Sequence, residues 1–233
     1  MCGMDREKLR VESMKKKNFV LLGESGSGKS EIAVNLACVL SKQSPDGKEV
    51  HFFDLDQTKP LFRSRDVKEL LEREGVIVHF EQQFLDTPTI VGGVEPCLKE
   101  EKCYTILDVG GNHTGARMIG RFSRLLNQED TEVCFVINPN RPWSKDVKSI
   151  DQTLSSILQV SSIRKVTIIS NPNLGSTTKV QEILEGHQNV LNMIQEFLPV
   201  RYLCVREDLC EEIRKKTDTL VLPLKLRMQY EGI

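Results

Sequence analysis

The 233-residue sequence has almost no net charge and no long apolar run. Its 32 basic and 33 acidic residues nearly cancel, so it lacks the concentrated basic composition of proteins that bind nucleic acids or anionic membranes. No apolar segment approaches the roughly 20 residues needed to cross a bilayer, and no signal-peptide core follows the charged N-terminus. These absences predict a cytoplasmic protein that does not bind membranes and does not have nucleic acid as a main partner.

Cysteine and histidine are present, but not at spacings typical of metal sites. The seven cysteines include no C-x-x-C pair, so the sequence predicts neither a disulfide framework nor a common zinc or iron–sulfur site. The same five-residue gap separates Cys97 from Cys103 and Cys204 from Cys210. His51 and His79 fall in predicted strands, where packing in the core is the ordinary role. We therefore expect reduced thiols and assign no metal to these residues.

Short apolar segments alternate with amphipathic ones along the chain. Several of the apolar segments are apolar at every position, which is typical of parallel strands covered by helices on both sides. The expected strands are residues 19–22, 50–54, 76–80, 104–108, 132–137, 165–170 and 201–205. The expected helices begin near residue 29 and cover residues 66–74, 114–126, 144–159, 177–197 with a break near Gly186, and 208–216. This rhythm predicts an α/β fold with a doubly wound, mostly parallel sheet and helices on both faces, in three α/β/α layers.

A phosphate-binding loop follows the first predicted strand and directly precedes a predicted helix. The segment matches G-x-x-x-x-G-K-[ST] at every fixed position, with the residues Gly23, Glu24, Ser25, Gly26, Ser27, Gly28, Lys29 and Ser30. Glycines let backbone N–H groups converge on phosphate, Lys29 can reach the β- and γ-phosphates, and Ser30 can ligate Mg²⁺. Residues 15–233 are therefore expected to form a single P-loop nucleotide-binding domain, preceded by a disordered N-terminal extension at residues 1–14.

Carboxylates follow two further predicted strands. Asp108 ends the strand at residues 104–108 and precedes two glycines, as expected of a carboxylate that helps to hold Mg²⁺ in a P-loop protein. Asp54 and Asp56 end the second strand, and the period-two alternation of a strand places both on the same side. Either could contact Mg²⁺ or orient an attacking water, and Asp56 lies farther out on the strand end.

The chain resembles the ParA/MinD/ArsA-type class of P-loop ATPases over roughly residues 18–226. The resemblance rests on the P-loop, on Asp54 and Asp56, and on the D-V-G-G turn at Asp108. A narrower likeness to a poorly characterised MinD/ParA-like group rests on Pro60-Leu61-Phe62-Arg63-Ser64-Arg65, Gly115-Ala116-Arg117, Gly120-Arg121, Arg141-Pro142 and Asn171-Pro172-Asn173-Leu174.

The resemblance implies ATP binding with Mg²⁺, slow hydrolysis, and a switch or assembly role in which the ATP state forms a homodimer or docks an unidentified protein partner. It assigns catalytic roles to Lys29 and Asp56, with Asp56 orienting the water. Ser30, Asp56 and Asp108 would serve as metal-side residues, and Asn171 would contact the adenine edge. The guanine-specific N-K-x-D motif is absent, and Asn171-Pro172-Asn173 stands in its place, which favours ATP and leaves GTP open.

The P-loop departs from that class at its second residue. ParA and MinD carry a signature lysine there that reaches the partner's phosphates, whereas this chain has Glu24, so hydrolysis by that route is not expected. Other loops offer cations that could replace it, namely Lys59, Arg63, Arg65, Arg117 and Arg121. The C-terminal LKLRMQYEGI is too short and too weakly amphipathic for the membrane-targeting helix of MinD.

Three functions stay open on the sequence alone. The first is a nucleotide-controlled ATP hydrolase of the ParA/MinD type. The second is an ATP-dependent phosphotransferase or ligase resembling dethiobiotin synthetase, in which Lys59 and the neighbouring arginines would bind a small anionic substrate. The third is a nucleotide-binding module without turnover, which the absence of the signature lysine favours.

Overall fold

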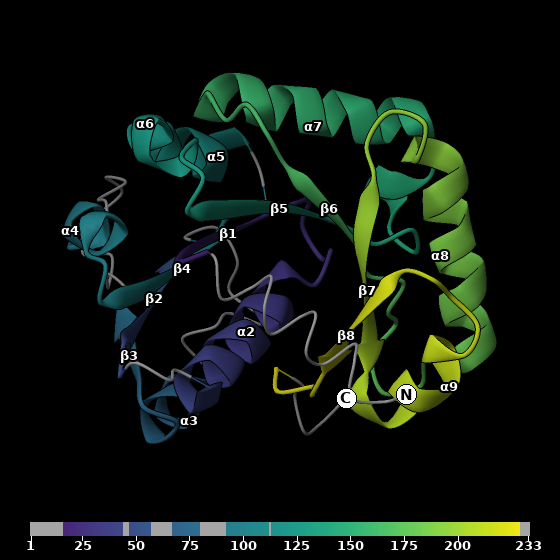
Figure 1. Ribbon diagram of the computed structural model, residues 1–233. Coiled ribbons are helices and arrows are strands. Elements are labelled where there is room, and N and C mark those ends of the chain that lie inside the picture. The colour runs from purple at the N-terminus through teal and green to yellow at the C-terminus, as the bar shows by residue number, and fades with distance from the viewer. Residues whose placement is uncertain (1–15, 44–46, 57–66, 80–91, 112, 229–233) are drawn as a thin grey trace.

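Eight parallel strands form one sheet in the computed structural model, which describes residues 16–43, 47–56, 67–79, 92–111 and 113–228. The strand order is β3-β2-β4-β1-β5-β6-β7-β8, and every neighbouring pair runs parallel (Figure 1). The strands are β1 (Asn18–Leu22), β2 (Glu49–Leu55), β3 (Val76–His79), β4 (Cys103–Val109), β5 (Thr131–Ile137), β6 (Thr167–Ser170), β7 (Val200–Arg206) and β8 (Leu220–Leu224). The expected extension at residues 1–14 lies outside the described residues.

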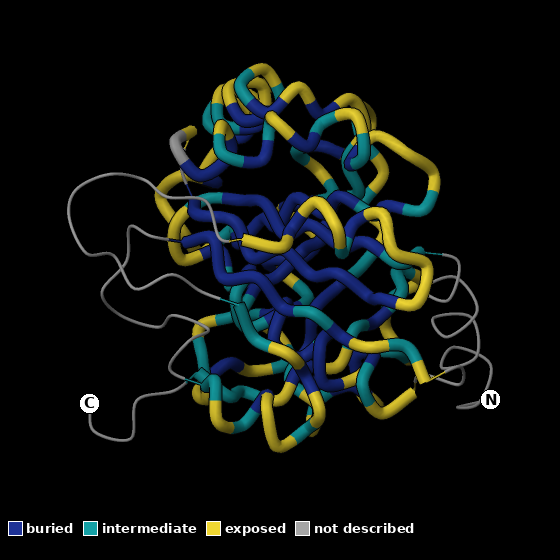
Figure 2. Tube along the Cα trace, turned by 90° about the vertical axis from the view of Figure 1, so that its left-hand side faces the viewer, coloured by how far each residue is buried: buried dark blue, intermediate teal, exposed yellow. Residues whose placement is uncertain are grey.

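Helices cover both faces of the sheet, as the sequence predicts. The helices are α2 (Lys29–Gln43), α3 (Lys68–Arg73), α4 (Val94–Lys99), α5 (His113–Gly120), α6 (Ser123–Leu126), α7 (Val147–Ser161), α8 (Val180–Ile194) and α9 (Cys210–Arg214), with short 3₁₀ turns η2 (Pro142–Ser144) and η3 (Glu207–Leu209). Apolar side chains of α2 and α3 pack on one face, and those of α4 to α8 pack on the other. The buried residues therefore concentrate along the strands between the two helical layers (Figure 2). Within the described segments, no helix is long and apolar enough to cross a membrane.

Two expected helices differ from their predicted form. The segment predicted as one helix at residues 114–126 is two helices, α5 and α6, separated by a turn after Gly120. The break expected near Gly186 is wrong, because α8 runs through it without interruption. An ideal Cβ at Gly186 would lie 2.5 Å from Pro172 Cβ and 3.2 Å from Pro139 Cγ. Gly186 therefore serves close packing of α8 against the loops after β5 and β6 rather than helix termination.

The order of the strands positions the P-loop. β1 lies between β4 and β5, so the chain leaves β1 toward one half of the sheet and returns to build the other half. Ligands of such sheets bind beyond the carboxyl ends of the strands at this point of reversal. The P-loop after β1, the carboxylates after β2 and at the end of β4, and Asn171 after β6 all lie at that edge.

Candidate functional site

The P-loop links the end of β1 to the first residue of α2. Gly23, Gly26 and Gly28 have φ values of +138°, +76° and +91°, which favour glycine. Gly28 is further constrained, because a Cβ there would lie 2.2 Å from the amide nitrogen of Asn171. These conformations turn the loop over the N-terminus of α2, where unpaired N–H groups and the helix dipole favour an anion.

Lys29 is buried beside the carboxylates that follow β2. Its Nζ lies 3.8 Å from Asp56 Oδ2, and the lysine is only 1% exposed. Asp54 Oδ1 accepts a hydrogen bond of 3.1 Å from the backbone N–H of Asp56, which bends the chain as it leaves the strand. This local turn presents the Asp56 carboxylate to the lysine of the P-loop.

Asp108 is fully buried at the end of β4, directly opposite Asp54 in the strand pairing. Burial raises its pKa to about 7; the Lys29 charge and the Ser30 hydroxyl oppose this rise, and the charges of Asp54 and Asp56 add to it. Neither carboxylate oxygen of Asp108 accepts a hydrogen bond of normal geometry from the described residues. A buried carboxylate with free lone pairs next to the Ser30 hydroxyl is the donor set that a Mg²⁺ ion uses, so these residues fit a magnesium site.

The turn after β4 lies against both the P-loop and Asp56. An ideal Cβ at Gly111 would approach Ser25 N to 2.6 Å, and one at Gly110 would approach Asp56 Oδ1 to 3.2 Å. This turn leads into α5, whose first residue His113 is exposed, and α5 packs along α7. The turn is therefore connected through α5 to α7.

Side chains from three other segments form hydrogen bonds with the P-loop, two with its backbone and one with the Glu24 side chain. Asn171 Nδ2 donates to Ser27 O over 2.7 Å, and Arg141 Nε donates to Gly26 O over 3.1 Å. The Glu24 carboxylate accepts a hydrogen bond of 3.0 Å from Thr153 Oγ1 on α7. Sequence reasoning missed these contacts of Arg141 and Thr153, because nothing local in the sequence pairs residues more than a hundred positions apart. The assignment of Asn171 to an adenine edge stays a prediction.

The candidate replacement cations are only partly described. Lys59, Arg63 and Arg65 lie outside the described residues. Arg117 is exposed on α5, and the Arg121 guanidinium carbon lies 5.3 Å from the centre of the Phe122 ring.

Comparisons with known proteins agree with this geometry. A family model described as the CobQ/CobB/MinD/ParA nucleotide binding domain matches residues 19–214, which confirms the resemblance to the MinD/ParA class. No curated protein matches the chain in sequence.

Two solved FtsY structures share the fold at low sequence identity. Chloroplast FtsY from Physcomitrella patens is 18% identical with a TM-score of 0.52, over 81% of this chain and 58% of that chain. FtsY from Thermotoga maritima is 19% identical with a TM-score of 0.50, over 82% and 62%. A nucleotide-binding protein in complex with ADP from Archaeoglobus fulgidus is 15% identical with a TM-score of 0.46, over 96% and 97%. The chain thus spans about three fifths of the length of these FtsY chains, and the likeness shows the fold alone.

Proposed function

Because the chain belongs to the CobQ/CobB/MinD/ParA family of nucleotide-binding domains, we propose that it is a slow, Mg²⁺-dependent ATP hydrolase that acts as a nucleotide-controlled switch. The proposal rests on one observation, which is that Lys29, Asp56 and Asp108 lie together at the N-terminus of α2. Magnesium would neutralise phosphate charge when bound. Ser30 and Asp108 would hold the ion, Lys29 would contact the phosphates, and Asp56 would orient the attacking water.

The switch would act through the D-V-G-G turn. The close approach of Gly111 to Ser25 and of Gly110 to Asp56 supports this, because a γ-phosphate held by the P-loop would act on the same turn. From there α5 and α7 would carry the change to the surface, where a second copy of the chain or another protein would bind the ATP state.

ATP is the proposed nucleotide in preference to GTP. Asn173, the third residue of the segment that replaces N-K-x-D, uses its side-chain oxygen to accept hydrogen bonds from Gly175 N and Thr178 Oγ1. The Asn171 amide nitrogen is bonded to the P-loop itself. The fourth position, where N-K-x-D has the aspartate that recognises guanine, is Leu174, so the segment has no carboxylate at that place.

The lone tryptophan offers a direct binding assay. Trp143 is 49% exposed and lies two residues after Arg141, which contacts the P-loop. We expect its fluorescence to change on titration with ATP and Mg²⁺, and to change less with GTP. The variant Lys29→Ala should lose the response, because the lysine contributes the positive charge nearest to the phosphates.

Measuring phosphate release from ATP distinguishes a hydrolase from a nucleotide-binding module without turnover. Wild type should release phosphate from ATP only with Mg²⁺, and Asp56→Asn should keep nucleotide binding while phosphate release falls at least about a hundredfold. Light scattering of Asp56→Asn in ATP should show a trapped dimer. Asp130→Asn is a matched control, because this carboxylate lies at the opposite edge of the sheet, paired with Lys17 at 3.4 Å. Unchanged turnover in Asp56→Asn would contradict the proposed role.

A non-hydrolysing module is the second candidate, and the contact of Glu24 favours it. The glutamate at the signature-lysine position faces Thr153 of its own chain and carries the wrong charge to serve a partner's phosphates. Tight ATP binding with no phosphate release and no change in mass would support this module. Phosphate release that appears only on adding a small anionic substrate would instead support the phosphotransferase.

A further inference from the structure

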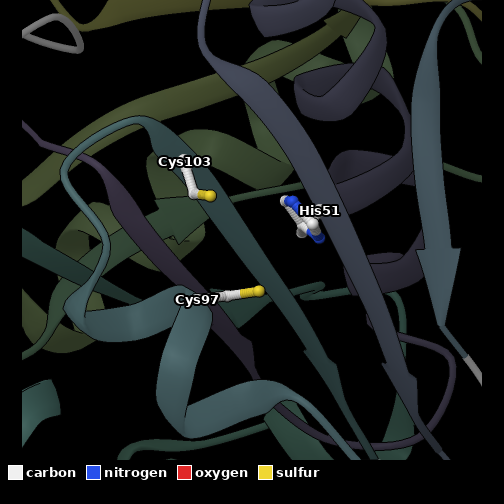
Figure 3. A group of neighbouring side chains, drawn as sticks. All are labelled: His51, Cys97 and Cys103. Carbon is white, nitrogen blue, oxygen red and sulfur yellow. The ribbon is translucent and has the colours of Figure 1, made fainter.

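Three potential metal ligands from separate elements meet at the amino edge of the sheet. His51 lies on β2, Cys97 on α4 and Cys103 at the start of β4, and one ligand atom of each lies within 4.8 Å of the others. In Figure 3 the side chains of Cys97 and Cys103 both point toward the His51 ring. Within the described residues this is the one group of three or more such side chains that could hold a metal ion.

Strand pairing explains why the three residues meet. His51 pairs with Thr105, two residues beyond Cys103, so the side chains of His51 and Cys103 project from the same face of neighbouring strands. Helix α4 packs on this face through Val94 and Leu98, and it brings Cys97 close to His51 and Cys103. The cluster depends on the sheet and on α4 together, so the spacing of these residues in the sequence does not predict it.

The surroundings of His51 resemble those of a metal-bound imidazole. His51 Nδ1 lies 2.9 Å from His79 Nε2, and the His79 ring stacks on Phe53 with centroids 4.3 Å apart. A ring nitrogen held in this way at Nδ1 leaves Nε2 of His51 as the nitrogen available to a metal. His51 Nε2 then faces Glu49, whose Oε2 lies 3.3 Å away.

We propose that His51, Cys97 and Cys103 bind a thiophilic divalent cation, Zn²⁺, with the Glu49 carboxylate as the fourth donor. Two thiolates, one imidazole and one carboxylate are ligands that zinc takes in tetrahedral geometry. The bound ion would join α4 to β2 and β4.

This zinc site is separate from the nucleotide site. Five residues separate Cys103 from Asp108 on β4, so the two sites lie roughly 16 Å apart along the strand at about 3.3 Å per residue. An ordinary cysteine thiol has a pKa of about 8.5 and is mostly protonated at pH 7, whereas zinc binds the thiolate. Zinc binding must therefore release the protons of the two thiols.

The test uses the full-length chain, reduced and freed of metal. Wild type should bind one equivalent of Zn²⁺ with a Kd below about 1 µM and release about two protons per ion at pH 7. With Co²⁺ it should show thiolate-to-metal charge transfer and the visible bands of a tetrahedral site. Cys97→Ser and Cys103→Ser should each raise the Kd at least about tenfold and lose the charge-transfer band in part.

Two controls keep the result interpretable. Cys210→Ser replaces a buried thiol on α9, outside the proposed ligand set, that donates to the backbone oxygens of Val205 and Arg206, so zinc affinity should be unchanged. Asp108→Asn removes a carboxylate of the nucleotide site that could hold zinc, and it should leave the cobalt spectrum intact. Retained nucleotide binding, read from Trp143, shows that each thiol variant is folded.

Three outcomes would overturn the zinc site. The first is zinc affinity that is unchanged in both Cys97→Ser and Cys103→Ser. The second is a cobalt spectrum without thiolate charge transfer. The third is a Cys97–Cys103 disulfide that persists in protein kept under reductant. None of these outcomes bears on ATP turnover, so the zinc site and the proposed hydrolase stand or fall separately.

Discussion

The ionisation of Asp108 affects the stability of the nucleotide-free protein. Burial raises its pKa from an ordinary 3.8 to about 7. Between these values the folded protein binds more protons at Asp108 than the unfolded chain does. The contribution of Asp108 to the free energy of unfolding is therefore largest below pH 4 and falls as the pH rises toward 7 and beyond.

Asp108→Asn should remove this contribution. In metal-free protein we expect the variant to be more stable than wild type at pH 8 by about 2 kcal/mol, and to differ little from it at pH 4, because the amide carries no charge to desolvate. Urea unfolding at both pH values measures the difference. Asp208→Asn is the control, since Arg206 lowers the pKa of this exposed carboxyl and its removal should not stabilise the protein at pH 8. Equal pH dependence in wild type and Asp108→Asn would contradict the prediction.

The sequence pattern predicts individual residues of the nucleotide site, whereas it does not predict the cluster of His51, Cys97 and Cys103. Lys29 and Ser30 belong to a contiguous motif, and Asp108 ends an apolar strand, so local pattern alone placed them at one edge. His51, Cys97 and Cys103 come from two strands and a short helix, and only the register of β2 against β4 brings them together. The sequence assigns no metal to these residues because they lack the short spacings of common metal motifs. Such spacings carry no information on a site whose ligands come from separate elements.

At the scale of elements, Gly186 decides how closely α8 approaches the sheet. A glycine within a helix usually costs about 1 kcal/mol relative to alanine, so Gly186→Ala would stabilise an isolated α8. Here the added Cβ would lie 2.5 Å from Pro172 Cβ, and a proline ring cannot move aside easily. We expect the variant to lose about 1–3 kcal/mol of unfolding free energy.

A second site on α8 provides the control for that prediction. Asn189 is exposed on the same helix, and Asn189→Ala should raise stability by about 0.5 kcal/mol through helix propensity alone. Thermal and urea unfolding of the two variants separate packing from propensity. A gain in stability from Gly186→Ala would show that α8 shifts freely on the loops beneath it.

Two elements escaped the sequence prediction for physical reasons. β8 contains Pro223, which argues against a strand, yet β8 lies at the edge of the sheet and Pro223 is exposed there, so no backbone hydrogen bond is lost to a neighbour. α4 has six residues with Pro96 in its first turn, too few for a helical period to show. The seven predicted strands were short apolar segments, and all seven are present.

At the scale of the whole molecule, α2 joins the P-loop to the last described segment of the chain. Asn35 on α2 donates to Lys225 O and accepts from Lys225 N, each over 2.9 Å. Glu31 accepts from the backbone N–H groups of Arg227 and Met228 over 2.8 and 3.0 Å. These hydrogen bonds hold residues 225–228 against α2, so the helix that follows the P-loop and the last described segment of the chain stabilise each other.

Asn35→Ala should loosen this connection without touching the nucleotide. The change leaves the N–H and C=O of Lys225 without their partner in a partly buried place, which costs about 2 kcal/mol and lowers Tm by roughly 5 °C. Amide hydrogen exchange should quicken in β8 and stay unchanged in β2 and β3, because only the edge that holds β8 loses its support. Asn189→Ala again serves as the exposed control. A drop in Tm accompanied by faster exchange throughout the sheet would show instead that residues 225–228 open only with the whole molecule.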